Sequence, residues 1–241
     1  MRLATSRAGK NHILYDADSL CDAGTAPQIG PSLLDPAWWR AQQRITGEAP
    51  GRGASLFLDP GNGEEWVLRP YRRGGLVARL SERRYLWTGL EHTRAFRELR
   101  LIAELLRLGL PVPRPVAAGI TRHGLTYEAA LITVRLPGAR ALAGLLQNGE
   151  ADDALLRRVG ATVRRFHDAG LDHVDLNARN LLVDDEGKVW LIDLDRCRRR
   201  SDGGWKERNL ERLERSLTRF NNAEAIGNIR RGYQAAIQSL T

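Results

Sequence analysis

Three short polar side chains stand at fixed spacing in two neighbouring segments of the sequence. Asp175 and Asn180 lie five residues apart in the segment HVDLNARNLLV, and Asp193 lies in the segment LIDLD that follows it. A turn at Gly187 separates two short apolar runs, so we expect a hairpin that brings all three polar groups to one edge. A carboxylate with a carboxamide suits Mg²⁺, a hard cation that prefers oxygen ligands and takes some of them from phosphate.

The carboxylate of Asp175 is then available to orient an alcohol. Phosphoryl transfer needs this combination, because its transition state asks for charge neutralisation by a metal and for a positioned nucleophile. A single Asp or Asn in a polar loop is usually only a turn former, and the joint spacing carries the prediction. Asp195 is a second-ranked metal ligand, and we interpret His173 as a structural residue that braces the loop.

The order of patterns along the chain predicts the elements that must position these residues. Prolines and small residues in 1–35 predict an irregular arm, and 36–136 combines alternating strand patterns with one long helix over 91–108. A link at Pro137 leads to a mainly helical region, 137–241, which carries the polar loop. We therefore expect a β-rich amino-terminal lobe followed by a helical carboxyl-terminal lobe.

The polar loop resembles the catalytic loop and metal-binding aspartate of the protein-kinase-like superfamily, with the pattern H-x-D-L-N-x-x-N followed by I-D. The stretches VLRPYRRGGLVARL, TRAFRELRLIAELLRLGLPVPRPVAA, HVDLNARNLLV and WKERNLERLERSL are similar to the 3-deoxy-D-manno-octulosonic acid (Kdo) kinase family of Gram-negative bacteria. This resemblance runs from about Asp35 to Leu217 and implies an α+β, two-lobed protein-kinase-like fold. It also implies that Asp175 is the base, and that Asn180 and Asp193 bind the metal.

The same resemblance implies an ATP site in the β-rich lobe, with ATP and Mg²⁺ as cofactors. Gly51 and Gly53 would let backbone amides approach the ATP phosphates, although a Gly-x-Gly alone is also a common turn. Glu98 would pair with the cation that contacts phosphate. The family pattern places a lysine there, whereas Arg69 is the nearest candidate in this chain, and its guanidinium can pair bidentately.

Two features narrow the acceptor to a small or lipid-linked hydroxyl. Asn177 stands where protein serine/threonine kinases carry lysine, and no proline follows Pro137, so the element that closes a protein-kinase activation segment is absent. The resemblance implies the 4-hydroxyl of a Kdo residue on Kdo-lipid A, in lipopolysaccharide core biosynthesis. The alternatives are another small-molecule phosphotransferase, acting on a heptose or a soluble acceptor, and a non-catalytic basic binding protein.

The charge of the chain favours an anionic partner. Lys+Arg 37 against Asp+Glu 29 gives a formal net charge of +8, and only three of the cations are lysines. The resemblance implies a position at the cytoplasmic face of the inner membrane. Because no apolar run is long enough to cross a bilayer, we expect the contact with this anionic surface to be peripheral. Arg72 and Arg73 are hypothetical contacts to acidic sugar or lipid phosphate. No nucleic-acid partner is expected, because no helix-turn-helix, RNP or zinc pattern is visible.

Overall fold

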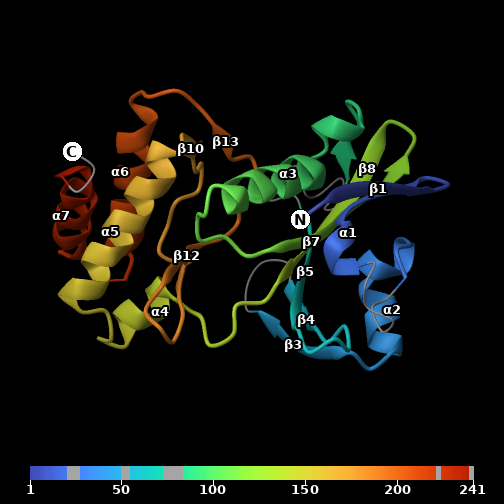
Figure 1. The fold of residues 1–241 in the computed structure, drawn as a ribbon, viewed down its shortest axis with the longest axis horizontal. Coiled ribbons are helices and arrows are strands. Elements are labelled where there is room, and N and C mark those ends of the chain that lie inside the picture. Colours follow the sequence, from blue (N-terminus) through green and yellow to red (C-terminus); the bar gives the residue numbers. More distant parts are fainter. Residues whose placement is uncertain (21–27, 50–54, 73–83, 221–223, 239–241) are drawn as a thin grey trace. The chain divides into compact units, whose positions relative to one another are not determined.

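The computed structural model describes residues 1–20, 28–49, 55–72, 84–220 and 224–238. The chain divides into two compact units, one of residues 1–103 with 114–135 and one of residues 104–113 with 136–241. The first unit is built around a β-sheet, and the second consists mainly of helices (Figure 1).

The sheet of the first unit holds the strand with Arg69 near its centre. Its order is β1-β2-β7-β8-β5-β4-β3, with the short β6 also paired to β8. The strands are β1 (Leu3–Ala8), β2 (Asn11–Asp16), β3 (Ile45–Ala49), β4 (Ser55–Leu58), β5 (Trp66–Pro70), β6 (Tyr85–Leu86), β7 (Pro115–His123) and β8 (Thr126–Val134). The described pairings are antiparallel, so successive side chains along each strand alternate between the two faces of the sheet.

The amino-terminal segment is more regular than its composition indicates, and the expectation of an irregular arm over 1–35 is corrected. β1 and β2 form a hairpin, and β2 continues the sheet by pairing with β7. Its turn is at Gly9, whose φ of +60° lies in the left-handed region that glycine adopts without strain. The strand NHILYD buries Ile13 and Leu14. Burial of these two side chains stabilises the strand even though small residues and prolines are frequent in the rest of the segment. The short helices α1 (Ala17–Leu20) and η1 (Pro31–Leu34) follow.

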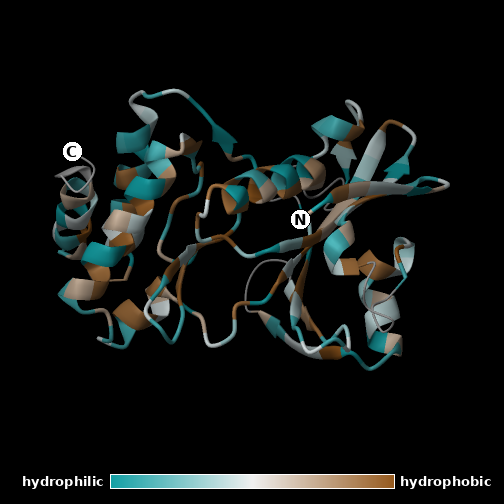
Figure 2. Cartoon of the chain, in the orientation of Figure 1, coloured by the Kyte–Doolittle hydropathy of each residue, from teal (hydrophilic) through white to brown (hydrophobic). Residues whose placement is uncertain are grey.

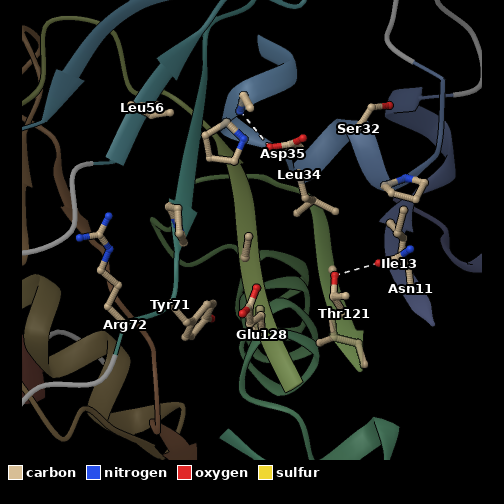
Figure 3. A pocket seen from close by; sticks show the side chains of 18 of the residues that line it. Asn11, Ile13, Ser32, Leu34, Asp35, Leu56, Tyr71, Arg72, Thr121 and Glu128 are labelled. Carbon is tan, nitrogen blue, oxygen red and sulfur yellow. Dashed lines mark hydrogen bonds between the residues drawn. The ribbon is translucent and has the colours of Figure 1, made fainter. Parts of the chain in front are cut away.

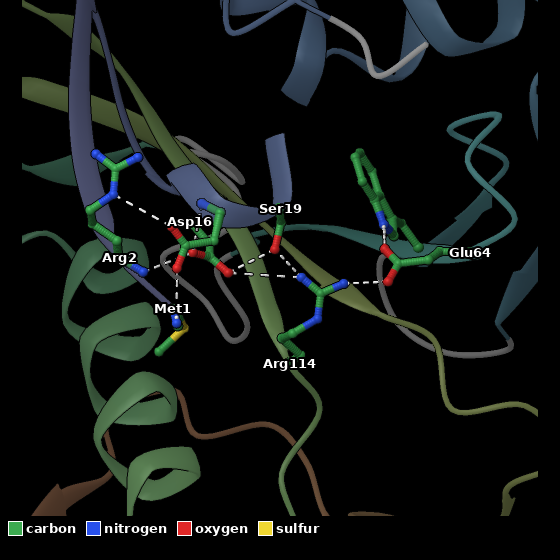
Figure 4. A network of polar contacts seen from close by, with 8 residues as sticks. Met1, Arg2, Asp16, Ser19, Glu64 and Arg114 are labelled. Atoms are coloured by element: carbon green, nitrogen blue, oxygen red, sulfur yellow. Dashed lines mark hydrogen bonds and ion pairs between the residues drawn. The ribbon is translucent and has the colours of Figure 1, made fainter. Parts of the chain in front are cut away.

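Arg114, the residue before β7, connects this segment to the turn that precedes β5 (Figure 4). Its guanidinium contacts the hydroxyl of Ser19, the buried carboxylate of Asp16 at 3.8 Å, and the carboxylate of Glu64. Burial raises the pKa of Glu64, but hydrogen bonds from the Trp66 indole and from Arg114 outweigh it and lower that pKa. One arginine therefore connects three separate parts of the sequence.

One face of the sheet is covered by η1 and α2 (Pro36–Ala41). Asp35 caps α2 by accepting from the backbone N–H of Ala37 at 2.9 Å, as expected of an aspartate at a helix start. Trp39 is fully buried, lies 6.3 Å from the ring of Trp66, and donates its indole N–H to the carbonyl of Leu33. Trp39 therefore packs in the hydrophobic core of this unit, and apolar residues appear in brown in Figure 2.

The long helix of the first half, α3 (Arg94–Arg107), follows the short η3 (Leu90–His92). Ala95, Leu99 and Ile102 are buried, as their spacing of three to four residues predicts for one helix face. The helix ends before Gly109, whose φ of +70° is typical of a helix carboxyl terminus. This helix carries Glu98 on its buried face.

The second unit is a helical body with short strand pairs. Its elements are β9 (Arg140–Ala141), α4 (Leu142–Gln147), α5 (Asp153–Asp168), β10 (Leu171–Asp172), β11 (Leu181–Val183), β12 (Val189–Leu191), β13 (Arg198–Arg199), α6 (Trp205–Thr218) and α7 (Ala225–Gln238). Helices α5 and α7 approach so closely that a Cβ on Gly160 would lie 1.9 Å from the carbonyl oxygen of Ile229. A Cβ on Gly232 would lie 2.0 Å from the carbonyl oxygen of Arg157, so glycine is required on both helices.

Candidate active site

Asp175 lies exposed in the loop between β10 and β11. Hydrogen bonds to its backbone carbonyl hold the main chain of this loop. The side-chain amides of Asn177 and Asn180 each donate to the backbone carbonyl of Asp175 at 2.9 Å. The amide oxygen of Asn177 in turn accepts from the backbone N–H of Arg179. Such short-range bonds from asparagine hold a turn without any regular secondary structure, and the exposed Asp175 therefore stands on an ordered loop.

The loop is also anchored to the helical body through Ser216. The buried hydroxyl of Ser216, in α6, accepts from the backbone N–H of Ala178 at 3.0 Å. The carbonyl of Ala178 accepts from the backbone N–H of Ala143 at the start of α4. The sequence analysis did not identify Ser216, because a serine in the last turn of a helix, 38 residues from its partner, carries no recognisable signal.

His173 connects the loop to the strand that precedes Asp193. Its Nε2–H donates to the carbonyl of Ile192 at 3.1 Å, and the side chain is buried. Burial is the main cause that lowers the pKa of this imidazole, so the neutral form is favoured. His173 is thus a brace, as predicted.

The hairpin β11–β12 brings Asn180 and Asp193 to the same end. Leu181 pairs with Leu191, and just beyond this pair the backbone N–H of Ile192 donates to the carbonyl of Asn180 at 3.0 Å. Asp193 has a φ of +60°, in the left-handed region that an aspartate enters more readily than most residues but that remains uncommon. Backbone strain of this kind is concentrated at functional sites, which agrees with a role for Asp193.

The donor atoms at this end of the hairpin suit a hard cation. The amide nitrogen of Asn180 donates to the main chain, which leaves its side-chain oxygen, and an amide oxygen and the carboxylate of Asp193 are both ligand types that Mg²⁺ takes. Within the described part of the chain, no three His, Cys, Asp or Glu side chains form a group that would hold a metal alone. The residues therefore fit a cation that completes its shell with phosphate oxygens.

In the first unit, the structure brings together Arg69 and Glu98, the predicted ion pair. An Nη2 of Arg69, in β5, donates to Oε1 of Glu98, in α3, at 2.5 Å. The Glu98 side chain is only 2% exposed, whereas 26% of the Arg69 side chain is exposed. A buried carboxylate needs such compensation, because an uncompensated charge in the interior is strongly destabilising.

Tyr71 is a third member of this cluster, and the sequence analysis missed it. Its hydroxyl donates to Oε2 of Glu98, and the guanidinium carbon of Arg69 lies 4.8 Å from the centre of its ring. The available signal was its position two residues after Arg69, which places both side chains on one face of an extended strand.

Several predicted contact residues cannot be compared with the structure. Gly51 and Gly53, the predicted phosphate-loop glycines, and Arg73 lie outside the described residues. Arg72 is described and is exposed.

A cavity of about 700 Å³ lies in the first unit, and Tyr71 and Arg72 belong to its lining (Figure 3). It is lined by η1, α2 and the neighbouring strands, with Leu34 and Leu56 beside Asp35 and Glu128. Neither Arg69 nor Glu98 belongs to its lining.

Comparisons with known proteins agree with the family resemblance of the sequence. Residues 36–236 match the model of the lipopolysaccharide kinase (Kdo/WaaP) family. The chain is 39% identical to a 3-deoxy-D-manno-octulosonic acid kinase of Vibrio parahaemolyticus, over 86% of this chain and 84% of the relative. It is 43% identical to a protein of the same name from Stenotrophomonas maltophilia, over 93% of this chain and 87% of the relative.

Among solved structures, the chain is similar to WaaP, determined in complex with acyl carrier protein. The TM-score is 0.54 at 19% sequence identity, and the match covers 83% of each chain. At this identity the likeness shows the fold alone, and it confirms the predicted kinase-like fold, with a β-sheet region followed by a helical region.

The family match and the relatives also confirm the predicted enzyme class, a kinase that uses ATP and phosphorylates an alcohol group. The chain belongs to the Kdo/WaaP lipopolysaccharide kinase family, as a Kdo kinase of lipopolysaccharide biosynthesis.

Proposed function

We propose that this chain transfers the γ-phosphoryl group of ATP to the 4-hydroxyl of a Kdo residue on Kdo-lipid A. The observation that carries the proposal is the exposed Asp175 on a loop held by Asn177 and Asn180, in a chain whose relatives are Kdo kinases. Orienting an alcohol for in-line attack is the principal task of such a carboxylate.

In the proposed reaction, Asp175 accepts a hydrogen bond from the acceptor hydroxyl and takes its proton. The hydroxyl oxygen forms a bond to the γ-phosphorus while the bond from that phosphorus to the bridging oxygen breaks, and ADP leaves with the electron pair. Asn180 and Asp193 would hold Mg²⁺, which supplies charge neutralisation at the phosphates when it is bound.

The first unit would contribute nucleotide binding. Arg69 is proposed to contact ATP phosphate from its ion pair with Glu98, and Gly51 and Gly53 are proposed to let main-chain amides approach the phosphates. A guanidinium offers several donors in one plane, which suits a phosphate group that needs more than one hydrogen bond.

We further propose that the protein lies peripherally on the anionic cytoplasmic face of the inner membrane. None of the helices that the structure describes combines the length and the apolar character required to cross a bilayer. At the end of the β7–β8 hairpin and on the adjoining β6, Leu125 is 79% exposed and Leu86 is 70% exposed. Exposed Arg84 and Arg122 lie beside these leucines in the sequence, and leucine next to arginine suits an anionic lipid surface.

The acceptor is tested by measuring ATP consumption with lipid A precursors that carry or lack Kdo. We expect turnover only with the Kdo-bearing lipid, and mass spectrometry with NMR of the product should place the phosphate on the 4-hydroxyl. Equal turnover with the Kdo-free lipid, or turnover only with a heptose acceptor, would contradict the proposal.

The membrane contact is tested by vesicle sedimentation of the double variant Leu86→Ser, Leu125→Ser. We expect binding to phosphatidylglycerol vesicles to fall about tenfold, with weak binding to phosphatidylcholine vesicles throughout. Leu108→Ser removes another exposed leucine and is the matched control. If the double variant binds as well as this control, the contact lies elsewhere.

A further inference from the structure

The carboxylate of Glu98 receives two donors from the same face of one strand. Arg69 contacts Oε1 and Tyr71 contacts Oε2. These two residues are separated by one position in the extended chain, whereas Leu68 belongs to the core on the other face. The backbone N–H of Tyr71 donates to the carbonyl of Ala129, in β8, at 2.9 Å. This hydrogen bond fixes the position of Tyr71 relative to β8.

The ring of Tyr71 also lies close to two guanidinium groups. The central carbon of Arg69 is 4.8 Å from the ring centre, and that of Arg94 is 5.6 Å from it. A planar guanidinium can stack on an aromatic face and still donate in its own plane to a carboxylate. A lysine ammonium is a compact, strongly hydrated charge, and it stacks less well in such a position.

We propose that Tyr71 is a positioning residue that orients Glu98 and makes arginine, rather than lysine, the effective cation at position 69. With 2% of its side chain exposed, Glu98 has almost no access to water, so its second oxygen depends on a protein donor. Tyr71 supplies that donor and, through its ring, the surface on which Arg69 lies. This inference rests on the proposed role of Arg69 in binding ATP phosphate.

The first test compares Tyr71→Phe with Tyr127→Phe. Each change removes one buried tyrosine hydroxyl that binds α3: Tyr71 binds Glu98, and Tyr127 accepts from the backbone N–H of Arg94 at 3.0 Å. We expect Tyr71→Phe to raise KM for ATP about tenfold with kcat nearly unchanged, because a hydrogen bond to a charged group is lost. Tyr127→Phe should lower Tm and leave KM unchanged. Equal KM values in the two variants would overturn the positioning role.

The second test measures the cost of Arg69→Lys in two backgrounds. With Tyr71 present we expect Arg69→Lys to raise KM for ATP about tenfold. In the Tyr71→Leu background, Arg69→Lys should raise KM for ATP by less than about twofold. An equal rise of KM for ATP in both backgrounds would show that the tyrosine ring is not the reason that arginine works better than lysine at position 69.

Two further variants separate this inference from the proposed function. If Arg69→Ala leaves KM for ATP unchanged, the proposed role of Arg69 in ATP binding is wrong. The coupling of Tyr71→Phe with Glu98→Gln, measured by chemical denaturation, tests the orientation of Glu98 independently of ATP. Additive effects on the free energy of unfolding would overturn it even if Arg69 binds nucleotide.

Discussion

The two groups of site residues are held in place by different kinds of contact. In the first unit, Arg69, Tyr71 and Glu98 hold one another through their side chains, around a buried charge. In the second unit, the loop around Asp175 is held by side chains that bind main-chain atoms: Asn177, Asn180, His173 and Ser216. The first arrangement holds the charged side chains of Arg69 and Glu98 in place. The second holds the main chain of the loop that carries the exposed carboxylate of Asp175.

This difference predicts different responses to substitution. Loss of one member of the first group leaves a charge with fewer partners, which should weaken the nucleotide binding that we propose for this group. Loss of a supporting residue in the second group frees a segment of backbone, which alters stability together with the position of Asp175. Loss of Asp175 itself should leave the loop intact, because its side chain is exposed and its carbonyl is what the loop binds.

The largest expected effect is that of Asp175→Asn. We expect kcat to fall by about 10²–10⁴-fold, since the proton acceptor is lost, while ATP binding and Tm stay close to those of the parent. Steady-state kinetics with calorimetric ATP titration measures both. Glu186→Gln neutralises another exposed carboxylate, in the turn of the β11–β12 hairpin, and should leave kcat unchanged. A large drop in Tm for Asp175→Asn would show that the loop depends on that carboxylate after all.

The next largest effect concerns the helices that carry the second unit. Gly160→Ala would place a methyl group 1.9 Å from the carbonyl oxygen of Ile229, so we expect a destabilisation of about 1–3 kcal/mol or more in chemical denaturation. Gly144→Ala, in α4, has open space around the added carbon and is the matched control. It should be neutral or slightly stabilising. Equal stabilities would mean that α5 and α7 separate at low cost.

A smaller effect is expected from Ser216→Ala. The buried N–H of Ala178 then loses its acceptor, which should cost about 1–3 kcal/mol of stability and reduce kcat through a looser loop. Ser201→Ala, at an exposed position, is the control for the loss of a serine hydroxyl. A drop in Tm with unchanged kcat would confine Ser216 to a structural role and weaken the contrast between the two groups.

The smallest effect near neutral pH is expected from His167, a buried residue of α5 in the second unit. Burial is the main cause that lowers the pKa of His167 to about 3, and its Nδ1 shares a 2.8 Å hydrogen bond with the hydroxyl of Tyr233. The unfolded chain protonates this histidine near pH 6.5, so stability is complete above that pH and is lost progressively as the pH falls toward 3.

The measurement is Tm between pH 7 and pH 4 for the parent and for His167→Gln. The parent should lose stability more steeply on acidification, because glutamine takes up no proton. Parallel pH profiles would show that another group controls acid unfolding.

The sequence predicts best what is local. Asn180 and Asp193 flank one hairpin, so spacing and a turn were enough to place them at its end, and Asp175 lies in the loop that leads into it. The first strands were missed because prolines and small residues dominate the segment 1–35, while the alternation that forms β2 spans only a few residues.

Contacts between distant segments were harder to predict. The pair of Arg69 with Glu98 followed from a family resemblance and not from spacing, since 29 residues separate the partners. Tyr71 and Ser216 bind partners 27 and 38 residues away. Tyrosine and serine occur in many environments, so a single sequence does not indicate such contacts. The roles of Gly51 and Gly53 stay predictions.

The positive φ of Asp193 determines how an inactive form of this enzyme is best made. Alanine at that position would remove the carboxylate but keep a Cβ in the left-handed region, which costs L-residues about 1–2 kcal/mol and which aspartate enters more readily than alanine. Glycine removes the same carboxylate and adopts the same backbone without strain. Asp193→Gly is therefore the variant that tests the proposed metal-binding role of Asp193 with the least disturbance of the backbone.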